Sequence, residues 1–166
     1  MNALYGIWGE DGTQLSRPLL CRAVRLLWGW TKLPELTRSD RGKPEFADGG
    51  HWLSLAHSGG CALCALSDEG PIGADVELVR PHREGLPRYV MSREEFGRFD
   101  GSWEDFSRIW TLKEAFCKRT DMPLFPPREV RTPPDCPYRS YKGRDWRAAI
   151  CCTGEPPEDI LWLDSL

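Results

Sequence analysis

The stretch Gly73-Ala74-Asp75-Val76-Glu77 reads as a short strand with two unlike faces, and the organisation of the chain can be worked out from it. Residues two apart in a strand point to the same side, so Asp75 and Glu77 would share one face while Val76 points into a core. Two neighbouring carboxylates indicate a site for a hard cation. Mg²⁺ is the natural candidate, because it binds a few carboxylates and completes its shell with water and phosphate oxygens.

The later segment from Trp110 to Lys118 supplies a third carboxylate. On a helix, Glu114 and Lys118 are four residues apart and share a face. A separate apolar stripe on the same helix consists of Ile109, Leu112 and Phe116. We therefore expect a helix over residues 103–119 that buries this stripe against a sheet and turns Glu114 and Lys118 toward the strand carboxylates.

The first half of the chain is predicted to be one helix followed by antiparallel strands. A strand over 4–8 precedes a helix whose apolar face runs from Leu15 to Trp30, with Ser16 as its N-cap and Pro18 in its first turn. Residues 37–50 are polar and glycine-rich and are predicted to be a loop. The strands that follow are expected over 52–56, 61–66 and 72–78, the first two joined by a turn at Gly59-Gly60.

The second half repeats this order. Helices are expected over 92–99 and 103–119, then a proline-rich break at 123–134, then strands over 137–141 and 146–152. The predicted fold class is therefore α+β, with two pseudo-repeats of helices packed on small antiparallel sheets. We expect the repeats to be residues 1–79 and 80–166, forming one compact unit with the site in the cleft between them.

Composition excludes several classes of protein. The chain has 166 residues and a formal net charge of -3, which is unlike a bulk electrostatic binder of nucleic acid. Its apolar runs are too short to span a membrane, and its N-terminus does not read as a signal peptide. Seven cysteines, an odd number, favour free thiols and a cytoplasmic protein. Cys61 and Cys64 have metal-ligand spacing, but they lie in an apolar run and are interpreted as buried hydrophobes rather than zinc ligands.

Two local groups of basic residues could attract phosphates or could be solvated turn charge. They are Lys32, Arg38, Arg41 and Lys43 in the first half, and Arg139, Lys142, Arg144 and Arg147 in the second.

Five motifs in order resemble one known family. They are Gly42-Lys43-Pro44, Ser54-Leu55-Ala56-His57-Ser58, Gly73 to Glu77, Met91-Ser92-Arg93-Glu94-Glu95-Phe96 and Trp110 to Lys118. The chain resembles the 4'-phosphopantetheinyl transferase superfamily, and the order and spacing resemble its surfactin-synthetase-activating, two-repeat type. The resemblance implies Mg²⁺-dependent transfer of phosphopantetheine from coenzyme A to a serine of an apo carrier protein, with release of 3',5'-ADP, by a monomer.

The resemblance also implies roles for individual residues. The metal ligands would be Asp75, Glu77 and Glu114. Contacts with coenzyme A would come from Lys43 near its adenosine end, from His57 and Ser58 at its phosphates, and from Lys113 and Lys118, of which Lys118 would contact the phosphate next to the breaking bond. Glu95 matches the glutamate proposed as the base that activates the carrier serine, and spacing alone does not distinguish it from the adjacent Glu94. On a helix beginning near Ser92, however, Glu95 is also placed to complete a capping box.

The segment from Arg80 to Arg98 mixes arginines with apolar residues, and we expect it either to receive an acidic amphipathic helix of the carrier or to pack the core of the second half.

The chain departs from the family pattern in two places. The histidine motif commonly reads Asn-x-Ser-His-Ser, whereas Ala56 replaces the middle serine here. The first strand also runs almost directly into the helix, where larger members carry a basic segment that contacts the 3'-phosphate of coenzyme A. Both differences predict weak coenzyme binding. Two other functions remain open: an Mg²⁺-dependent nucleotide pyrophosphate hydrolase, and a non-catalytic relative that binds the carrier or the coenzyme.

Overall fold

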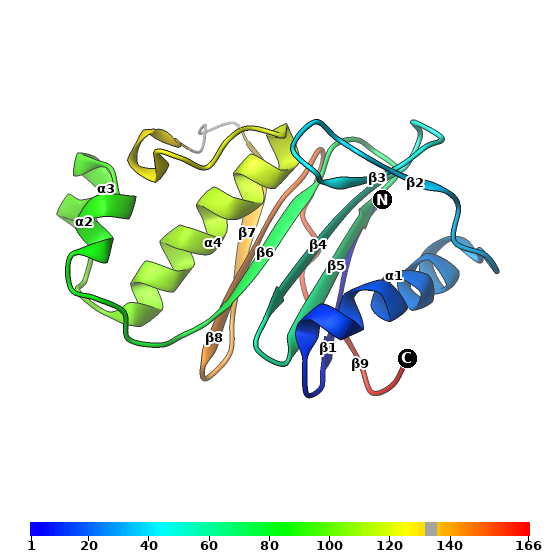
Figure 1. Cartoon of the computed structure of the whole chain (residues 1–166), viewed down its shortest axis with the longest axis horizontal. Helices are drawn as coiled ribbons and strands as arrows, with labels where there is room; N and C mark the ends of the chain where they lie inside the picture. The colour runs from blue at the N-terminus through cyan, green and yellow to red at the C-terminus, as the bar shows by residue number, and fades with distance from the viewer. Residues whose placement is uncertain (132–135) are drawn as a thin grey trace.

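The computed structural model describes residues 1–131 and 136–166, so the end of the predicted proline-rich break lies outside the described residues. The chain forms an α+β fold in which α1 (Gly12–Trp28) covers one sheet and α4 (Trp103–Thr120) covers another (Figure 1). The α+β fold class is thereby confirmed.

The first sheet has four strands in the order β4-β5-β1-β9. These are β1 (Asn2–Trp8), β4 (Trp52–Ser58), β5 (Cys61–Ser67) and β9 (Leu161–Leu163). β1 pairs antiparallel with β5 and parallel with β9, so the end of the chain returns to the sheet in which the chain begins. The predicted loop over 37–50 contains a small ribbon of its own, made of β2 (Leu36–Arg38) and β3 (Pro44–Phe46).

The predicted start of the first helix was wrong. The helix begins at Gly12, and the Asp11 side chain caps it by accepting the Thr13 amide at 2.9 Å. The Ser16 hydroxyl instead donates to the Gly12 carbonyl one turn earlier, and Pro18 lies inside the helix. A carboxylate is as good an N-cap as a serine, and the true cap lies five residues earlier in the chain.

The second sheet has three strands in the order β6-β8-β7. They are β6 (Gly73–Leu78), β7 (Tyr138–Lys142) and β8 (Trp146–Cys151). Between β6 and β7 the chain forms α2 (Leu86–Val90), α3 (Arg93–Arg98), α4 and the short 3-10 helix η1 (Pro127–Glu129).

The two halves share one topology. In each half, the strand before the long helix pairs with the last strand of the hairpin that follows the helix. Read from that first strand, the orders are β1-β5-β4 and β6-β8-β7. β6 therefore belongs to the sheet of the second half. The predicted boundary between the repeats at residue 79 would place β6 in the first half, apart from its partner strand β8. The segment between Ser67 and Gly73 is instead where the chain passes from the first sheet to the second.

A shared core joins the sheets. Buried side chains from β1, β4 and β5 pack with those of β6 and β8, among them Leu4, Leu63, Val76 and Ile150. β4 and β6 lie side by side (Figure 1). Two hydrogen bonds link these strands. The backbone amides of Ala74 and Leu78 on β6 donate to the hydroxyl oxygens of Ser54 and Ser58 on β4, at 3.0 and 3.1 Å.

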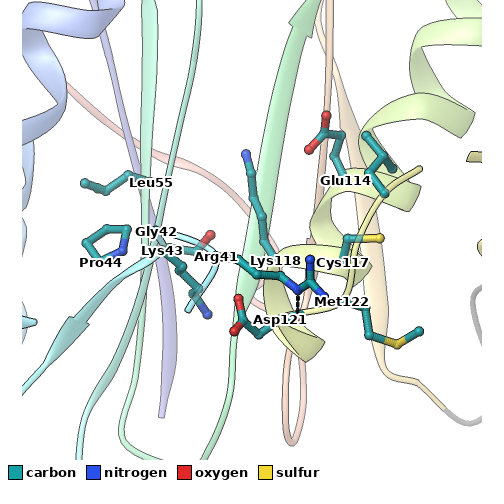
Figure 2. A pocket seen from close by; sticks show the side chains of 12 residues that line it. Arg41, Gly42, Lys43, Pro44, Leu55, Glu114, Cys117, Lys118, Asp121 and Met122 are labelled. Atoms are coloured by element: carbon teal, nitrogen blue, oxygen red, sulfur yellow. Dashed lines mark hydrogen bonds between the residues drawn. The ribbon is translucent and has the colours of Figure 1, made fainter. Parts of the chain in front are cut away.

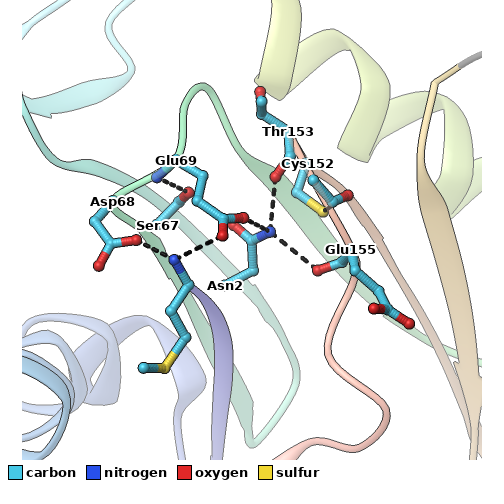
Figure 3. Close-up of polar contacts among 9 residues, drawn as sticks. Asn2, Ser67, Asp68, Glu69, Cys152, Thr153 and Glu155 are labelled. Atoms are coloured by element: carbon cyan, nitrogen blue, oxygen red, sulfur yellow. Dashed lines mark hydrogen bonds and ion pairs between the residues drawn. The ribbon is translucent and has the colours of Figure 1, made fainter.

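The start of β1 is also tied to the segment after β8 (Figure 3). The Asn2 side-chain amide donates to the carbonyls of Thr153 and Glu155, at 2.7 and 3.0 Å. The seven cysteines are free, and six of them are buried. Within the described residues, no helix combines the length and apolar character needed to cross a bilayer.

Candidate active site

The site is built on the face of β6 that is turned toward α4. Ala74 and Val76 alternate with this face and are buried in the shared core. Gly73 lies where α4 crosses β6, and a Cβ there would collide with the Ala115 carbonyl and the Arg119 backbone nitrogen. The missing side chain lets the helix approach the strand closely, which brings Asp75 against α4.

The two carboxylates predicted to share a face both lie beside α4, although their burial differs. Asp75 is 7 % exposed, and one of its carboxylate oxygens accepts a hydrogen bond of 2.8 Å from the Lys118 ammonium. Burial raises the pKa of Asp75, while Lys118 opposes that rise. Burial and then the Asp75 charge raise the pKa of Glu77, which is itself paired with Arg80 at 3.6 Å.

Glu114 completes the cluster from the helix side. Burial, followed by the charges of Asp75 and Glu77, raises its pKa to about 7, although Lys118 lowers it. Glu77 and Glu114 therefore each experience the charge of a neighbouring acid, whereas burial alone raises the pKa of Asp75. The predicted convergence of two strand carboxylates with Glu114 and Lys118 is seen in the structure.

The donor set suits Mg²⁺, because carboxylate oxygens are hard ligands and a cation would compensate both the burial of these acids and the repulsion that Glu77 and Glu114 experience. The side chains are not arranged as a finished cage. Within residues 1–131 and 136–166, no three His, Cys, Asp or Glu side chains are grouped closely enough to hold an ion, and Asp75 is occupied by Lys118. Mg²⁺ commonly uses one or two carboxylates with water and substrate phosphates, so a preformed cage is not required.

A cavity of about 280 Å³ opens next to the cluster. Figure 2 shows Glu114 and Lys118 projecting from α4, with Arg41 and Lys43 approaching from the connection between β2 and β3. Three cations thus line one cavity, which suits a phosphorylated ligand. Lys43 is the predicted coenzyme residue of this set. Its ammonium donates to the Ile72 carbonyl at 3.0 Å, and burial lowers its pKa.

Arg41 was predicted only as part of a basic group, and the structure shows how it reaches the cavity. Its Nε donates to the Asp121 carbonyl at 2.9 Å (Figure 2). The Ser39 hydroxyl also donates to the Asp121 carboxylate at 3.0 Å. These bonds attach the β2–β3 connection to the C-terminal end of α4. The contact joins residues about 80 positions apart, and no local pattern indicates it.

His57 and Ser58 lie at the end of β4 beside β6. The His57 ring is exposed, its Nδ1 is 3.5 Å from the Thr13 hydroxyl, and its charge is the smallest of the influences that lower the pKa of Asp75. Ser58 is buried and accepts the Leu78 amide. His57 therefore faces solvent near the carboxylates, while the Ser58 hydroxyl helps to join the two sheets.

Lys113 and Glu95 are not brought to the carboxylate cluster. Lys113 is 1 % exposed, and its ammonium donates to the carbonyls of Pro127 and Val130 and to Glu95, at 3.0, 2.8 and 2.8 Å. An ammonium has three hydrogens, so none is left for a phosphate. Glu95 also accepts the Ser92 amide at 2.8 Å and forms the capping box with Ser92. The capping alternative for Glu95 is therefore the one that the structure shows.

The prediction of weak coenzyme binding rested in part on Ala56, which stands where the family motif has a serine. Ala56 is 2 % exposed and belongs to the shared core with Ala74 and Val76. It lies between Ser54 and Ser58 on the side of β4 that contacts β6, because residues two apart in a strand share a face. A side chain at this position therefore lies in the shared core, and Ala56 is not among the residues that line the cavity beside Glu114 and Lys118.

The family models extend this description. Residues 71–151 match the model of the 4'-phosphopantetheinyl transferase superfamily, and this range includes β6, α4 and all three carboxylates. This part of the chain is therefore similar to that class of protein.

Three curated relatives carry names from the same class. The 4'-phosphopantetheinyl transferase AcpT of Escherichia coli K12 is 40% identical over 117 residues, which cover 66% of this chain and 60% of the relative. AcpT of Salmonella typhimurium is 37% identical over 111 residues, 62% of this chain and 55% of the relative. The 4'-phosphopantetheinyl transferase HetI of a Nostoc species is 40% identical over 91 residues, 48% of this chain and 38% of the relative. The alignments thus span about 55–60% of the AcpT proteins.

Proposed function

We propose that this chain transfers 4'-phosphopantetheine from coenzyme A to a serine of an apo carrier protein. The observation that carries the proposal is the meeting of Asp75, Glu77, Glu114 and Lys118 between β6 and α4, inside the segment that matches the superfamily. The adjoining cavity with Arg41, Lys43 and Lys118 offers the positive charge that a coenzyme with several phosphates requires.

The proposed step is a phosphoryl transfer. The serine oxygen forms a bond to the phosphorus that carries pantetheine, the bond to the leaving oxygen breaks, and that oxygen departs with 3',5'-ADP. Mg²⁺ held by Asp75, Glu77 and Glu114 would neutralise charge on the bridging phosphates. Lys118 adds a positive charge beside the same carboxylates, which would stabilise negative charge developing on the leaving phosphate.

The serine must also lose its proton. Glu95, the base implied by the resemblance, is held by Ser92 and Lys113. A role for Glu95 as base therefore requires this pair to open. His57 remains a proposed coenzyme contact because its ring is exposed beside the carboxylates. Ser58 and Lys113 are proposed to have structural roles, since each is engaged in hydrogen bonds with other protein groups.

The two-repeat type and a single-chain site are proposals as well. They are supported by the repeated strand order and by the position of the carboxylates beside the β4–β6 junction, where both halves meet within one chain. A cytoplasmic location remains a prediction.

Mass spectrometry tests the activity directly. Apo carrier proteins from fatty-acid, polyketide and peptide synthesis are each incubated with the protein, coenzyme A and Mg²⁺. We expect at least one carrier to gain the mass of a phosphopantetheine group, and we expect Asp75→Ala to lose at least about 99 % of that rate, as removal of a metal ligand from a phosphoryl-transfer site does. Asp159→Ala, an exposed acid far along the chain, is the matched control.

The same assay separates the alternatives. Loss of coenzyme A without any carrier would identify a hydrolase. Binding of coenzyme A without loss of coenzyme or modification of any carrier would identify a non-catalytic relative, and either result would overturn the proposed transfer.

A further inference from the structure

The two long helices end in the same backbone conformation but on different residues. α1 ends at Gly29, which has a φ of 71° and whose amide donates to the Arg25 carbonyl. α4 ends at Asp121, which has a φ of 51° and whose amide donates to the Cys117 carbonyl. This left-handed conformation favours glycine, because a Cβ is strained there. Asp121 is the one non-glycine residue with a positive φ in the described part of the chain, so its side chain calls for an explanation beyond helix termination.

The Asp121 side chain is bonded to residues 39–43 between β2 and β3, which we call the ribbon tip. Its carboxylate accepts a hydrogen bond of 3.0 Å from the Ser39 hydroxyl. The same hydroxyl oxygen accepts hydrogen bonds from the backbone amides of Arg41 and Lys43, at 3.3 and 3.2 Å. The bond from Ser39 to Asp121 therefore attaches the whole tip to the end of α4, across 82 positions of the chain.

The ribbon tip needs such an attachment. β2 and β3 form a sheet of only two strands, separate from both larger sheets, and an isolated two-stranded ribbon is marginally stable by itself. Leu36 and Phe46 at the base of the ribbon pack in the core of the first half. The tip lies at the other end, where it contacts the second half through Asp121.

The ribbon tip carries two of the three cations in the cavity of about 280 Å³ beside the carboxylates, which we call the coenzyme cavity. Arg41 and Lys43 of the tip and Lys118 of α4 line it, and Asp121 lines it as well (Figure 2). By charge alone, a carboxylate in this place would weaken the binding of phosphates. A residue with a strained backbone and an unfavourable charge is explained by the hydrogen bond that it makes to Ser39.

We propose that Asp121 is a positioning residue for coenzyme binding, which holds the ribbon tip through Ser39 and so fixes Arg41 and Lys43 where they meet the phosphates. The inference rests on the proposed function, because it concerns the coenzyme of that reaction. Asp121 acts through these cations and does not itself contact the ligand. Two cations that are already in place bind a polyanion more tightly than two that must first be ordered, since ordering side chains and loops on binding costs free energy.

Two substitutions of Asp121 separate the hydrogen bond from the charge. Asp121→Gly and Asp121→Asn both remove the negative charge, and both new residues tolerate the left-handed conformation. Only asparagine keeps a side-chain oxygen that accepts a hydrogen bond from Ser39. Ser39→Ala removes the same bond from its other end. Asp40→Asn is the matched control, because it neutralises an exposed acid of the same tip whose side chain forms no hydrogen bond or ion pair with the described residues.

Coenzyme A affinity is measured by calorimetry with Mg²⁺, and steady-state kinetics are measured with an apo carrier protein. We expect Asp121→Gly and Ser39→Ala to bind coenzyme A about fivefold or more weakly, with a similar rise in KM for coenzyme A and a smaller change in kcat. Asp121→Asn and Asp40→Asn should stay within about twofold of the wild type. The double variant of Asp121→Gly and Ser39→Ala should bind no more weakly than the weaker single variant, because both changes remove one bond.

Two further measurements distinguish positioning from general stability. The thermal melting temperature of Asp121→Gly should stay close to the wild-type value, because relief of the strained cap offsets the lost hydrogen bond. Hydrogen exchange over residues 36–46 in the free protein should become faster in Asp121→Gly and Ser39→Ala but not in Asp121→Asn. Weaker coenzyme binding that only accompanies a large loss of melting temperature would contradict the proposal.

Three other results would overturn the positioning role. They are wild-type coenzyme affinity in both Asp121→Gly and Ser39→Ala, equal weakening in Asp121→Asn, and no binding of coenzyme A by the wild type. If the wild type modifies a carrier while the Asp121 and Ser39 variants bind coenzyme A normally, the proposed function stands without this role. If the expected pattern of coenzyme affinities is found in a protein that modifies no carrier, the role of Asp121 stands and the proposed transfer fails.

Discussion

At the scale of single residues, burial decides what each charged group near α4 can do. Glu114 and Lys113 are neighbours in sequence, yet their surroundings differ. Burial and the neighbouring carboxylates raise the pKa of Glu114 to about 7, whereas Lys113 is enclosed by protein acceptors. The first arrangement favours binding of a cation, and the second favours structural support.

The raised pKa of Glu114 predicts a pH-dependent stability for the metal-free protein. The folded state holds this proton more tightly than the unfolded chain, so the contribution to stability is fully present below the ordinary pKa of 4.5 and is lost as the pH rises through about 7. In Glu114→Gln this loss cannot occur. Between about pH 5.5 and pH 8, with chelator present, we expect the wild type to lose roughly 2 kcal/mol more stability than Glu114→Gln.

Urea unfolding at both pH values measures the difference, with the exposed Glu94→Gln as control. Parallel pH profiles for the wild type and Glu114→Gln would contradict the carboxylate cluster. Added Mg²⁺ should reduce the wild-type loss at high pH if the cluster binds the ion.

Lys113→Met tests the role of the buried lysine. The change leaves the carbonyls of Pro127 and Val130 without their donor and leaves Glu95 without its cation. We expect a loss of about 2–4 kcal/mol in the free energy of unfolding, with coenzyme A affinity unchanged in calorimetry. The exposed Lys142→Met should change neither quantity. A stable Lys113→Met with tenfold weaker coenzyme binding would restore Lys113 as a ligand contact.

At the scale of elements, the approach of α4 to β6 sets the geometry of the site. α4 packs on β6 and β8 through Ala115, Phe116 and Cys117, which are buried with Ala149 and Cys151. Its N-terminal half packs instead with α2 through Ile109, Phe106 and Val90. The helix thus connects the candidate active site to the α2–α3 segment.

Gly73→Ala should disturb this approach directly. The new methyl group would meet backbone atoms of Ala115 and Arg119, which cannot rotate away as a side chain can. We expect a loss of about 1–3 kcal/mol in unfolding free energy, as overpacking of a core contact produces, together with a larger fractional loss of transfer activity because Asp75 and Lys118 move apart. Gly97→Ala, in open space on α3, is the control. Full activity in a normally stable Gly73→Ala would show that α4 does not rest on this glycine.

At the scale of the whole molecule, the two halves share a sheet and a hydrophobic core. β9 follows the second sheet in sequence and yet pairs with β1 of the first, while Ile160 just before it is buried in the core between the sheets. The serine bonds from β4 to β6 add a polar junction. These contacts predict that the halves unfold together.

Ile160→Ala tests that prediction. Removing a buried isoleucine side chain from the shared core should cost about 2–4 kcal/mol. Because the core belongs to both halves, far-ultraviolet circular dichroism and tryptophan fluorescence should shift to the same lower denaturant midpoint. Leu26→Ala, at an exposed position on α1, should leave the midpoint nearly unchanged. Separate transitions in Ile160→Ala would mean that the halves fold independently.

Much of the candidate site could be predicted from local patterns. Alternation in β6 placed Asp75 and Glu77 on one face, and helical spacing placed Glu114 and Lys118 together, because these periodicities are properties of the backbone itself. The main strands and the long helix were predicted for the same reason, and their observed bounds differ by a few residues at most. The repeat stays a prediction, which each half's own sequence of helix and strands suggested.

Tertiary structure alone decided the remaining features. Whether Lys113 meets a ligand or the carbonyls of Pro127 and Val130 depends on how residues beyond α4 fold back, and spacing within the helix carries no information about that. The contact between Arg41 and Asp121 and the pairing of β9 with β1 likewise join distant segments. Such contacts form because buried donors need acceptors and sheet edges need partners, and which of them meet is decided only when the chain packs.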